Sequence, residues 1–139
     1  MTDEEIEALF PNPPCSQLLG WQLLDHDEDR GWIRIGFDGR SDFLNPAGRV
    51  QGGILAAMLD DTMGPAVLLK SAGMLYPSSI DMNISFLRAA NAGPLFCEAD
   101  VLRLGKTVGF VQAQLMDADG RLLVRATSSV MLIPADRLA

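Results

Sequence analysis

Residues 52–69 read Gly-Gly-Ile-Leu-Ala-Ala-Met-Leu-Asp-Asp-Thr-Met-Gly-Pro-Ala-Val-Leu-Leu, and this stretch decides the fold. Its length and apolar composition predict a helix. Apolar residues occur on every side of that helix, which is typical of a helix buried inside a protein. Pro65 should kink or split it, because proline cannot donate a hydrogen bond to the carbonyl of Asp61. The rest of the chain must therefore cover a central helix.

The segments on both sides of this helix are predicted to be mainly strands. The clearest is 79–86, where Ile80 begins an alternation of apolar and polar residues with the period of a half-buried strand. A capping box at Thr2 predicts a short helix over residues 2–10. The other expected strands are 18–24, 32–37, 95–104, 107–116 and 121–133, with an acidic turn at 25–31 and a loop at 39–48. Together these elements predict one α+β domain over residues 1–139, in which an antiparallel sheet of about six strands wraps one central helix at about 52–69.

Charge and cysteine content exclude several classes of protein. With 18 acidic and 11 basic residues the formal charge is −7, whereas nucleic-acid binding needs positive charge. The first residues lack the pattern of a signal peptide, and no apolar run reaches about 18 uncharged residues. Two cysteines are too few for a disulfide scaffold. We therefore expect a cytoplasmic protein that binds neither nucleic acid nor membrane.

Three chemical motifs are suggested by fragments of the sequence, and all three fail. Residues 105–107 read Gly-Lys-Thr, but a phosphate-binding loop also needs glycine at position 100, which is aspartate. The acidic residues of 25–29 have calcium-loop spacing without the loop's glycine and final glutamate. His26 is the only histidine and lies in that acidic stretch, which rules against a Ser-His-Asp site. We expect no metal and no cofactor, so catalysis must rest on carboxylates, backbone amides and polar side chains.

One combination of residues remains at the beginning of the central helix. Gly52 and Gly53 open the helix, and the free N–H groups there favour an anion or a polarised carbonyl oxygen. The Gly52 N–H is therefore a natural oxyanion donor. Eight residues later, Asp60 and Asp61 lie in an otherwise apolar helix, where a carboxylate is costly unless it is paired or used. The alternative is that both aspartates are hydrogen-bonded for structural reasons alone.

The stretch from Asn45 to Asp60 reads N-x-x-G-x-x-Q-G-G-x-x-x-x-x-x-D. It resembles the N-x-x-G-x-x-H-G-G-x-x-x-x-x-x-D signature of the phenylacetate-pathway (PaaI-like) acyl-CoA thioesterases. The similarity continues through residues 79–83, 86–88 and 104–107. The resemblance implies a hotdog fold, an active site at a dimer interface, and hydrolysis of an acyl-CoA thioester to a free acid and CoA.

The resemblance also implies a role for each matching residue. The Gly52 N–H and the Asn45 amide would hold the thioester carbonyl oxygen. Asp60 of the partner subunit would activate water or attack the thioester directly, and Ser79 would help to place that water. Because successive helix residues point about 100° apart, we expect only Asp60, and not Asp61, to face the cleft.

Other residues are candidates for substrate binding. Gln51 stands where the family has histidine; it can hydrogen-bond but cannot titrate between pH 5 and 8. Its neighbour Gly53 belongs to the same turn. For the phosphates of CoA the candidates are Arg88, Arg103 and Lys106, since Arg and Lys suit phosphate recognition; ordinary solvated charge is their alternative.

Two other functions compete with thioester hydrolysis. A hotdog protein that binds acyl-CoA without cleaving it is favoured by Gln51, whereas a hotdog dehydratase would need a histidine beside the carboxylate. A sheet wrapped around one helix leaves edge strands uncovered, which predicts a homo-oligomer, either a dimer or a tetramer. The sequence leaves open whether the acyl group is aromatic, medium-chain or branched.

Overall fold

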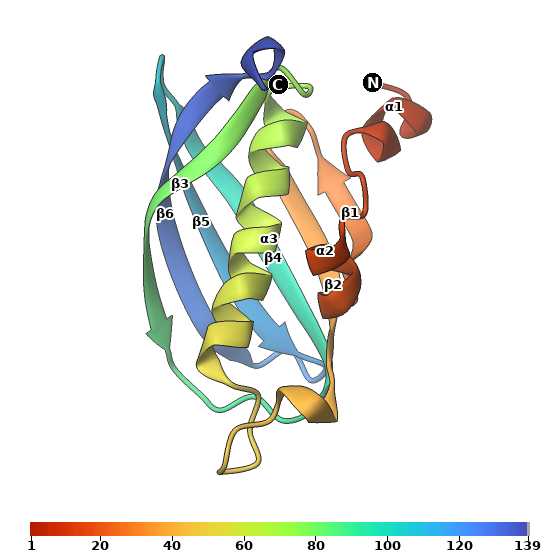
Figure 1. Ribbon diagram of the computed structural model, residues 1–139, viewed down its shortest axis with the longest axis vertical. Helices are drawn as coiled ribbons and strands as arrows, with labels where there is room; N and C mark the ends of the chain where they lie inside the picture. The colour runs from red at the N-terminus through yellow and green to blue at the C-terminus, as the bar shows by residue number, and fades with distance from the viewer. Residues whose placement is uncertain (139) are drawn as a thin grey trace.

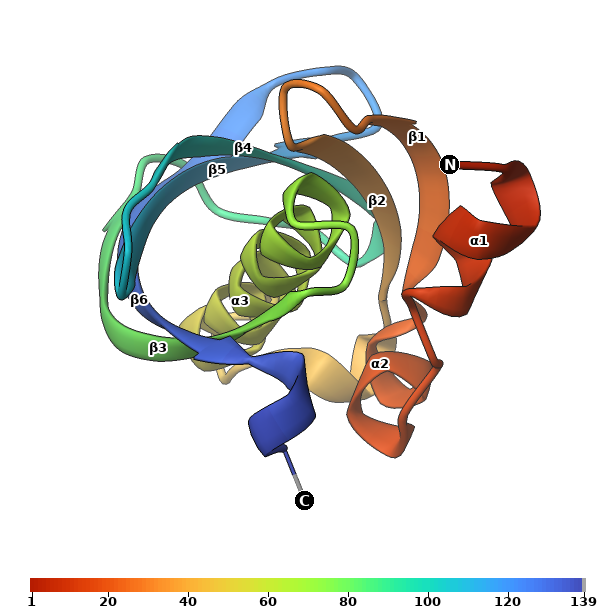
Figure 2. The same cartoon turned by 90° about the horizontal axis from the view of Figure 1, so that it is seen from above.

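Helix α3 (Gly52–Lys70) lies in the concave face of a six-stranded antiparallel sheet in the computed structural model of the chain (Figure 1), which describes residues 1–138. The order of strands in the sheet is β1-β2-β4-β5-β6-β3, so β1 and β3 form its two edges. Seen from above, the sheet curves around α3 (Figure 2). The bounds are β1 (Gln22–Asp27), β2 (Trp32–Gly39), β3 (Leu75–Phe86), β4 (Gly93–Leu104), β5 (Val108–Asp117) and β6 (Leu122–Pro134).

The core forms between α3 and the inner face of the sheet. Met58, Leu59 and Met63 of α3 are fully buried, and so are Ile33 and Ile35, which alternate along β2. Among the described residues, α3 is the one helix with the length and mean hydropathy (1.3) of a membrane span. The strands packed against it account for that apolar composition.

Helix α3 departs from the sequence prediction in two ways. It runs through Pro65 without a break, so of the two predicted effects of proline, a kink or a split, the split is wrong. It is also not buried on every side, because Gly53, Ala57 and Asp60 are exposed along one stripe. The sheet and the segment before β1 cover the other sides of the helix and leave this stripe open.

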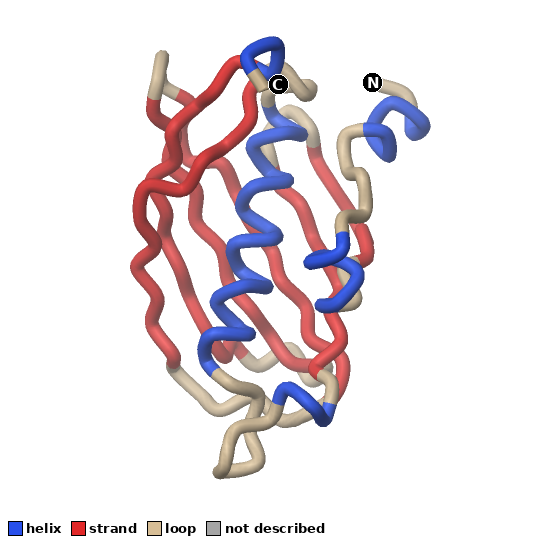
Figure 3. Tube along the Cα trace, viewed as in Figure 1, coloured by secondary structure: helices blue, strands red, loops and turns tan. Residues whose placement is uncertain are grey.

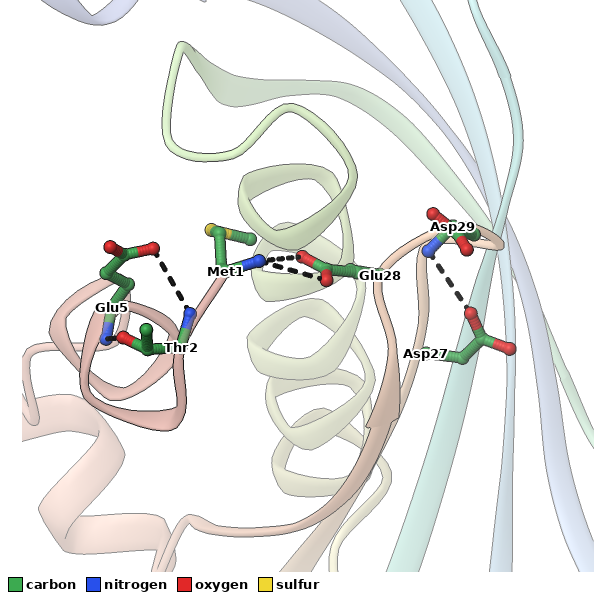
Figure 4. A network of polar contacts seen from close by, with 6 residues as sticks. All are labelled: Met1, Thr2, Glu5, Asp27, Glu28 and Asp29. Carbon is green, nitrogen blue, oxygen red and sulfur yellow. Dashed lines mark hydrogen bonds and ion pairs between the residues drawn. The ribbon is translucent and has the colours of Figure 1, made fainter.

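The chain before β1 folds as two short helices (Figure 3). Helix α1 (Asp3–Ala8) has the predicted capping box: Thr2 Oγ accepts a hydrogen bond from the Glu5 N–H at 3.1 Å, and Glu5 Oε2 accepts one from the Thr2 N–H at 3.2 Å. The Met1 ammonium group forms an ion pair with Glu28 at 3.2 Å, as Figure 4 shows. This pair attaches the beginning of the chain to the turn between β1 and β2.

The strand predicted over residues 18–24 is wrong in its first half. Residues 14–19 instead form helix α2 (Pro14–Leu19), with proline in its first turn, where the missing N–H is not needed. Gly20 ends the helix in the left-handed region with φ of 74°. Strand β1 begins only at Gln22 and continues to Asp27, into the predicted acidic turn. An edge strand tolerates these acidic residues because one side of it faces water.

The remaining elements lie close to their predicted places. Strands β2, β4, β5 and β6 begin and end within two residues of the predicted bounds, and β3 begins four residues early. Short 3-10 helices form at Ser41–Phe43, inside the predicted loop, and at Ala135–Arg137. The alternation assigned to β3 is wrong at Ile80, which is exposed because the register of β3 against β6 shifts between Ser79 and Asp81.

Candidate active site

The loop before α3 fixes the side chain of Asn45. Residues 43–45 pair with residues 49–51, which holds Asn45 at the N-terminal end of the helix. Asn45 Oδ1 accepts hydrogen bonds from the N–H groups of Ala47 at 3.0 Å and Arg49 at 3.1 Å. The loop therefore holds Oδ1 toward its own backbone, which leaves the Nδ2 amide free to donate to a ligand.

The first turn of α3 presents a free backbone donor. Gln51 is the N-cap, and its Oε1 accepts a hydrogen bond from the Ile54 N–H at 3.0 Å. Glycine at position 53 allows this cap, since a Cβ there would stand 2.8 Å from Gln51 Oε1. No group within residues 1–138 accepts a hydrogen bond from the Gly52 N–H. The side chain that replaces the family histidine therefore serves the helix, and the Gly52 N–H stays available as an oxyanion donor.

Asp60 lies on the open stripe of α3 and faces β3. Ser79 Oγ donates a hydrogen bond to Asp60 Oδ1 at 3.0 Å, and both residues are exposed. Exposure and this hydrogen bond together remove the cost that the sequence predicts for a carboxylate in an apolar helix. Ser79 orients the carboxylate, and no group of residues 1–138 occupies its second oxygen, so that oxygen can contact water or substrate.

Asp61 is held on the opposite flank by the segment before β1. Ser16 Oγ donates to Asp61 Oδ2 at 2.8 Å, and the indole N–H of Trp21 donates to the Asp61 carbonyl at 2.8 Å. That carbonyl is the one that Pro65 leaves without a helical donor. Burial raises the pKa of the Asp61 carboxyl above its ordinary value of 3.8, and the nearby charge of Asp60 adds to this effect. The structural alternative thus holds for Asp61.

A cleft of about 500 Å3 lies along the open stripe, between β3 and the segment before β1. Both aspartates line it, so the expectation that only Asp60 would face the cleft is wrong, although the two side chains are bound to opposite walls. Most of the remaining lining is apolar and includes Phe10, Trp21, Leu68, Tyr76 and Pro77. The volume is within the usual range of small-molecule sites.

One chain does not bring all the predicted catalytic groups together. Gly52 and Asp60 are eight residues apart in a continuous helix, which corresponds to ~12 Å along its axis. A carbonyl oxygen bound by an oxyanion donor lies only about 3 Å from it. The Gly52 N–H and Asp60 of the same chain are therefore too far apart to act on one thioester.

A family model described as the thioesterase superfamily matches residues 47–124, more than half of the chain. The chain belongs to the thioesterase superfamily. A protein of Saccharolobus solfataricus, provisionally named an esterase, is 30% identical over 89% of this chain and 87% of its own length. Acyl-coenzyme A thioesterase 13 of Homo sapiens is 33% identical over 58% of this chain and 59% of its own.

A solved structure supports the same assignment. A provisionally named thioesterase from Ralstonia eutropha JMP134, also called phenylacetic acid degradation-related, superposes with a TM-score of 0.83. It is 35% identical, and the match covers 91% of this chain and 95% of that one. The predicted hotdog fold, the PaaI-like resemblance and the assignment as a thioester hydrolase are therefore confirmed.

The three basic residues predicted to bind CoA are dispersed in the thioesterase chain. Arg88 lies between β3 and β4, and its N–H donates to the Leu123 carbonyl. Arg103 is near the far end of β4, and Lys106 follows in the next turn. Twelve residues of strand span about 40 Å. One chain therefore does not gather these side chains into a single phosphate site.

Sequence reasoning missed Ser16 and Trp21, which form the wall beside Asp61. The only signal was indirect: Pro65 indicates that the carbonyl four residues earlier needs another donor. The identity of that donor was hidden because Ser16 was assigned to no element and Trp21 to the strand predicted over 18–24, whereas Ser16 belongs to α2 and Trp21 lies between α2 and β1.

Proposed function

We propose that this thioesterase hydrolyses acyl-CoA at a site shared by two copies of the chain. The observation that carries the proposal is the hydrogen bond from Ser79 to Asp60 on the open stripe of α3, beside an apolar cleft. Asp60 from one copy would meet the Gly52 N–H and the Asn45 amide of the other. The ~12 Å between Gly52 and Asp60 within one helix supports the second copy.

The chemistry follows from the charges and donors of these groups. The Gly52 N–H and Asn45 Nδ2 donate to the thioester carbonyl oxygen and stabilise the negative charge that develops there. The Asp60 carboxylate takes a proton from water, which attacks the carbonyl carbon, or attacks that carbon itself to form an anhydride that water then cleaves. In either case the carbon–sulfur bond breaks, and CoA leaves as a thiolate that gains a proton.

Strand β3 is the proposed contact between the copies. It is a 12-residue edge strand with exposed Tyr76, Ile80 and Phe86. Long apolar edge strands are normally paired or blocked, and in an isologous dimer the same edge of each copy contacts that of the other. Light scattering at micromolar concentration should give at least twice the 15.0 kDa mass of one chain. A stable monomer would overturn the shared site.

The cleft beside Asp60 is proposed to hold the acyl group. Its lining favours an apolar acyl chain or ring, and Cys15 lies exposed at its wall. The second cysteine, Cys97, is buried, which raises the pKa of its thiol to about 12, so alkylating reagents should reach only Cys15. A non-hydrolysable thioether analogue of an acyl-CoA should slow this alkylation, and CoA alone should not. Equal protection by both would place the acyl group elsewhere.

Gly52→Pro tests the oxyanion donor with little disturbance of the helix. Gly52 is the first residue of α3, where proline is well tolerated, and Gln51 before it is already extended (φ −62°, ψ 137°). The substitution removes the N–H and adds the proline ring, and thiol release should fall by about 10²–10³-fold. Gly52→Ala is the matched control: it adds a Cβ at 3.4 Å from the Phe86 ring but keeps the N–H, so its rate should stay near the parent's.

Mixing two inactive variants tests whether the site is shared. Asp60→Asn and Gly52→Pro should each be inactive alone. After co-refolding in equal amounts, half of the dimers contain one copy of each, and one of their two sites has both native groups. Roughly a quarter of the parental rate should return. If mixing restores nothing while each variant remains dimeric, both groups belong to one chain and the two-copy mechanism fails.

A further inference from the structure

Strand β3 contains one extra residue next to Ser79. In its register against β6, Ser79 lies opposite Val130 and Asp81 lies opposite Ser129, so Ile80 between them has no partner. This arrangement is a β-bulge, which bends a strand and redirects its side chains, and bulges are common beside active sites. Odd-numbered residues before the bulge and even-numbered residues after it therefore face the same side of the sheet.

The bulge determines which side chain faces Asp60. Beyond it, Met82 lies opposite Ser128, whose side chain is buried on the α3 side of the sheet. Strict alternation counted back from Met82 would place Ile80 on that side and Ser79 on the outer face. The observed positions are reversed: Ser79 donates to Asp60, and Ile80 is 54% exposed. The extra residue therefore exchanges an apolar side chain for a hydroxyl at the carboxylate.

Two side chains satisfy the backbone groups at this irregularity. Ser128 Oγ donates to the Asp81 carbonyl at 2.7 Å, and the Ser129 N–H donates to Asp81 Oδ1 at 3.0 Å. Ser128 is only 4% exposed, so its hydroxyl needs a protein partner. The Asp81 carboxylate takes the place of a backbone acceptor for Ser129. Both contacts join β3 to β6 directly after the bulge.

We propose that Asp81 and Ser128 are positioning residues of this thioesterase. They hold the bulge at Ile80, and the bulge presents Ser79 to Asp60. The inference rests on the proposed catalytic role of Asp60. Without these two contacts the first half of β3 is free to shift against β6, and Ser79 no longer fixes the orientation of the carboxylate. Small displacements of this kind reduce the rate of the chemical step more than they reduce binding.

Asp81→Ala and Asp81→Asn separate positioning from general destabilisation. The alanine variant removes the acceptor for the Ser129 N–H, and its kcat should fall by about 10- to 100-fold while KM changes by less than about twofold. Asp81→Asn keeps an oxygen that can accept this hydrogen bond, so its kcat should stay within about threefold of the parent's. Should Asp81→Ala fail to fold, Ser128→Ala removes the other contact and should give the same loss of kcat at constant KM.

Asp117→Ala is the matched control. The Asp117 carboxylate also accepts hydrogen bonds from backbone N–H groups, those of Asp119 at 2.9 Å and Arg121 at 3.0 Å. These contacts are in the turn between β5 and β6 and do not involve Ser79 or Asp60. Asp117→Ala should lower the melting temperature and leave kcat at the parental value.

Hydrogen exchange of the Ser129 amide provides a readout without activity. The amide should be protected in the parent and in Asp81→Asn, and should exchange faster in Asp81→Ala. The proposal is overturned if Asp81→Ala exposes this amide yet keeps the parental kcat, or if the amide stays protected without the carboxylate. If Asp60→Asn releases thiol as fast as the parent, the proposed function fails instead, and amide exchange still decides whether Asp81 holds the bulge.

Discussion

Asp60 and Asp61 are adjacent residues of one type, but the structure gives them opposite environments. Asp60 is exposed and accepts one hydrogen bond, from a serine on the edge strand β3. Asp61 is half-buried, its carboxylate is bound by Ser16, and its carbonyl is bound by Trp21. The roles of the two aspartates are therefore determined by the elements on each side of α3. One flank leaves a carboxylate oxygen open for chemistry, and the other uses the neighbouring carboxylate to attach the segment before β1.

The largest expected effect comes from Asp60→Asn. The substitution keeps the shape of the side chain and an oxygen for Ser79, and removes the charge that we propose activates water or attacks the thioester. Loss of a general base typically reduces the rate by about 10²–10⁴-fold. The melting temperature should hardly change, because Asp60 is exposed. Thiol release and thermal unfolding measure the two quantities, and a variant with the parental kcat would exclude Asp60 as the catalytic carboxylate.

The second prediction concerns the opposite flank. Trp21→Phe removes the indole donor and leaves the Asp61 carbonyl unpaired, which should lower the free energy of unfolding by about 1–3 kcal/mol. Pro65→Ala gives back the helical N–H that proline lacks. In the Pro65→Ala background, Trp21→Phe should lower the free energy of unfolding by clearly less, because the Asp61 carbonyl then has another donor. Urea denaturation of the four proteins gives the coupling energy, and equal costs in both backgrounds would show that Trp21 acts through packing alone.

The same two flanks show how far the sequence could predict the molecule. The apolar stretch of α3 and the alternation of β2 predicted a helix wrapped by a sheet, since both patterns are local. The spacing from Gly52 to Asp60, with the family resemblance, predicted the groups on the helix. The wall beside Asp61 was not predictable in this way, because its donors come from a segment whose own short helix has few local signals.

The register of β3 was the other feature that the sequence did not predict. Alternation predicted Ile80 on the apolar side because a pattern of period two cannot show an inserted residue. The bulge is specified by contacts with β6, namely Ser128 and Ser129 on Asp81. These contacts link residues 47 and 48 positions apart. Ser79 was chosen by resemblance, and the structure supplies the physical reason that it faces Asp60.

A smaller effect is expected at Gln51, whose side chain accepts a hydrogen bond from the backbone of α3. Gln51→His restores the family residue, and an imidazole nitrogen can also accept from the Ile54 N–H. The fold should remain intact and the rate should change less than about tenfold, with no new titration near pH 6–7. A pH–rate profile for both proteins provides the check. A larger gain with a new inflection in that range would show that catalysis lacked a titratable group.

The smallest effect is expected for Asp61→Asn, which removes a charge and keeps an oxygen for Ser16. Its kcat should remain within about threefold of the parent's, because Asp61 is bound to the wall opposite Ser79.

Burial raises the pKa of the Asp61 carboxyl in the folded protein above its unfolded value. The folded state therefore prefers the protonated form, and this contribution to stability is complete below about pH 4 and is lost as the pH rises through the folded pKa. Asparagine does not titrate, so the stability of the parent relative to Asp61→Asn should fall from acid to neutral pH. Urea denaturation of both proteins at several pH values measures this difference. If the relative stability of the parent instead rises with pH, the hydrogen bond from Ser16 to the ionised carboxylate outweighs burial, and Asp61 belongs with the charged groups that the fold stabilises.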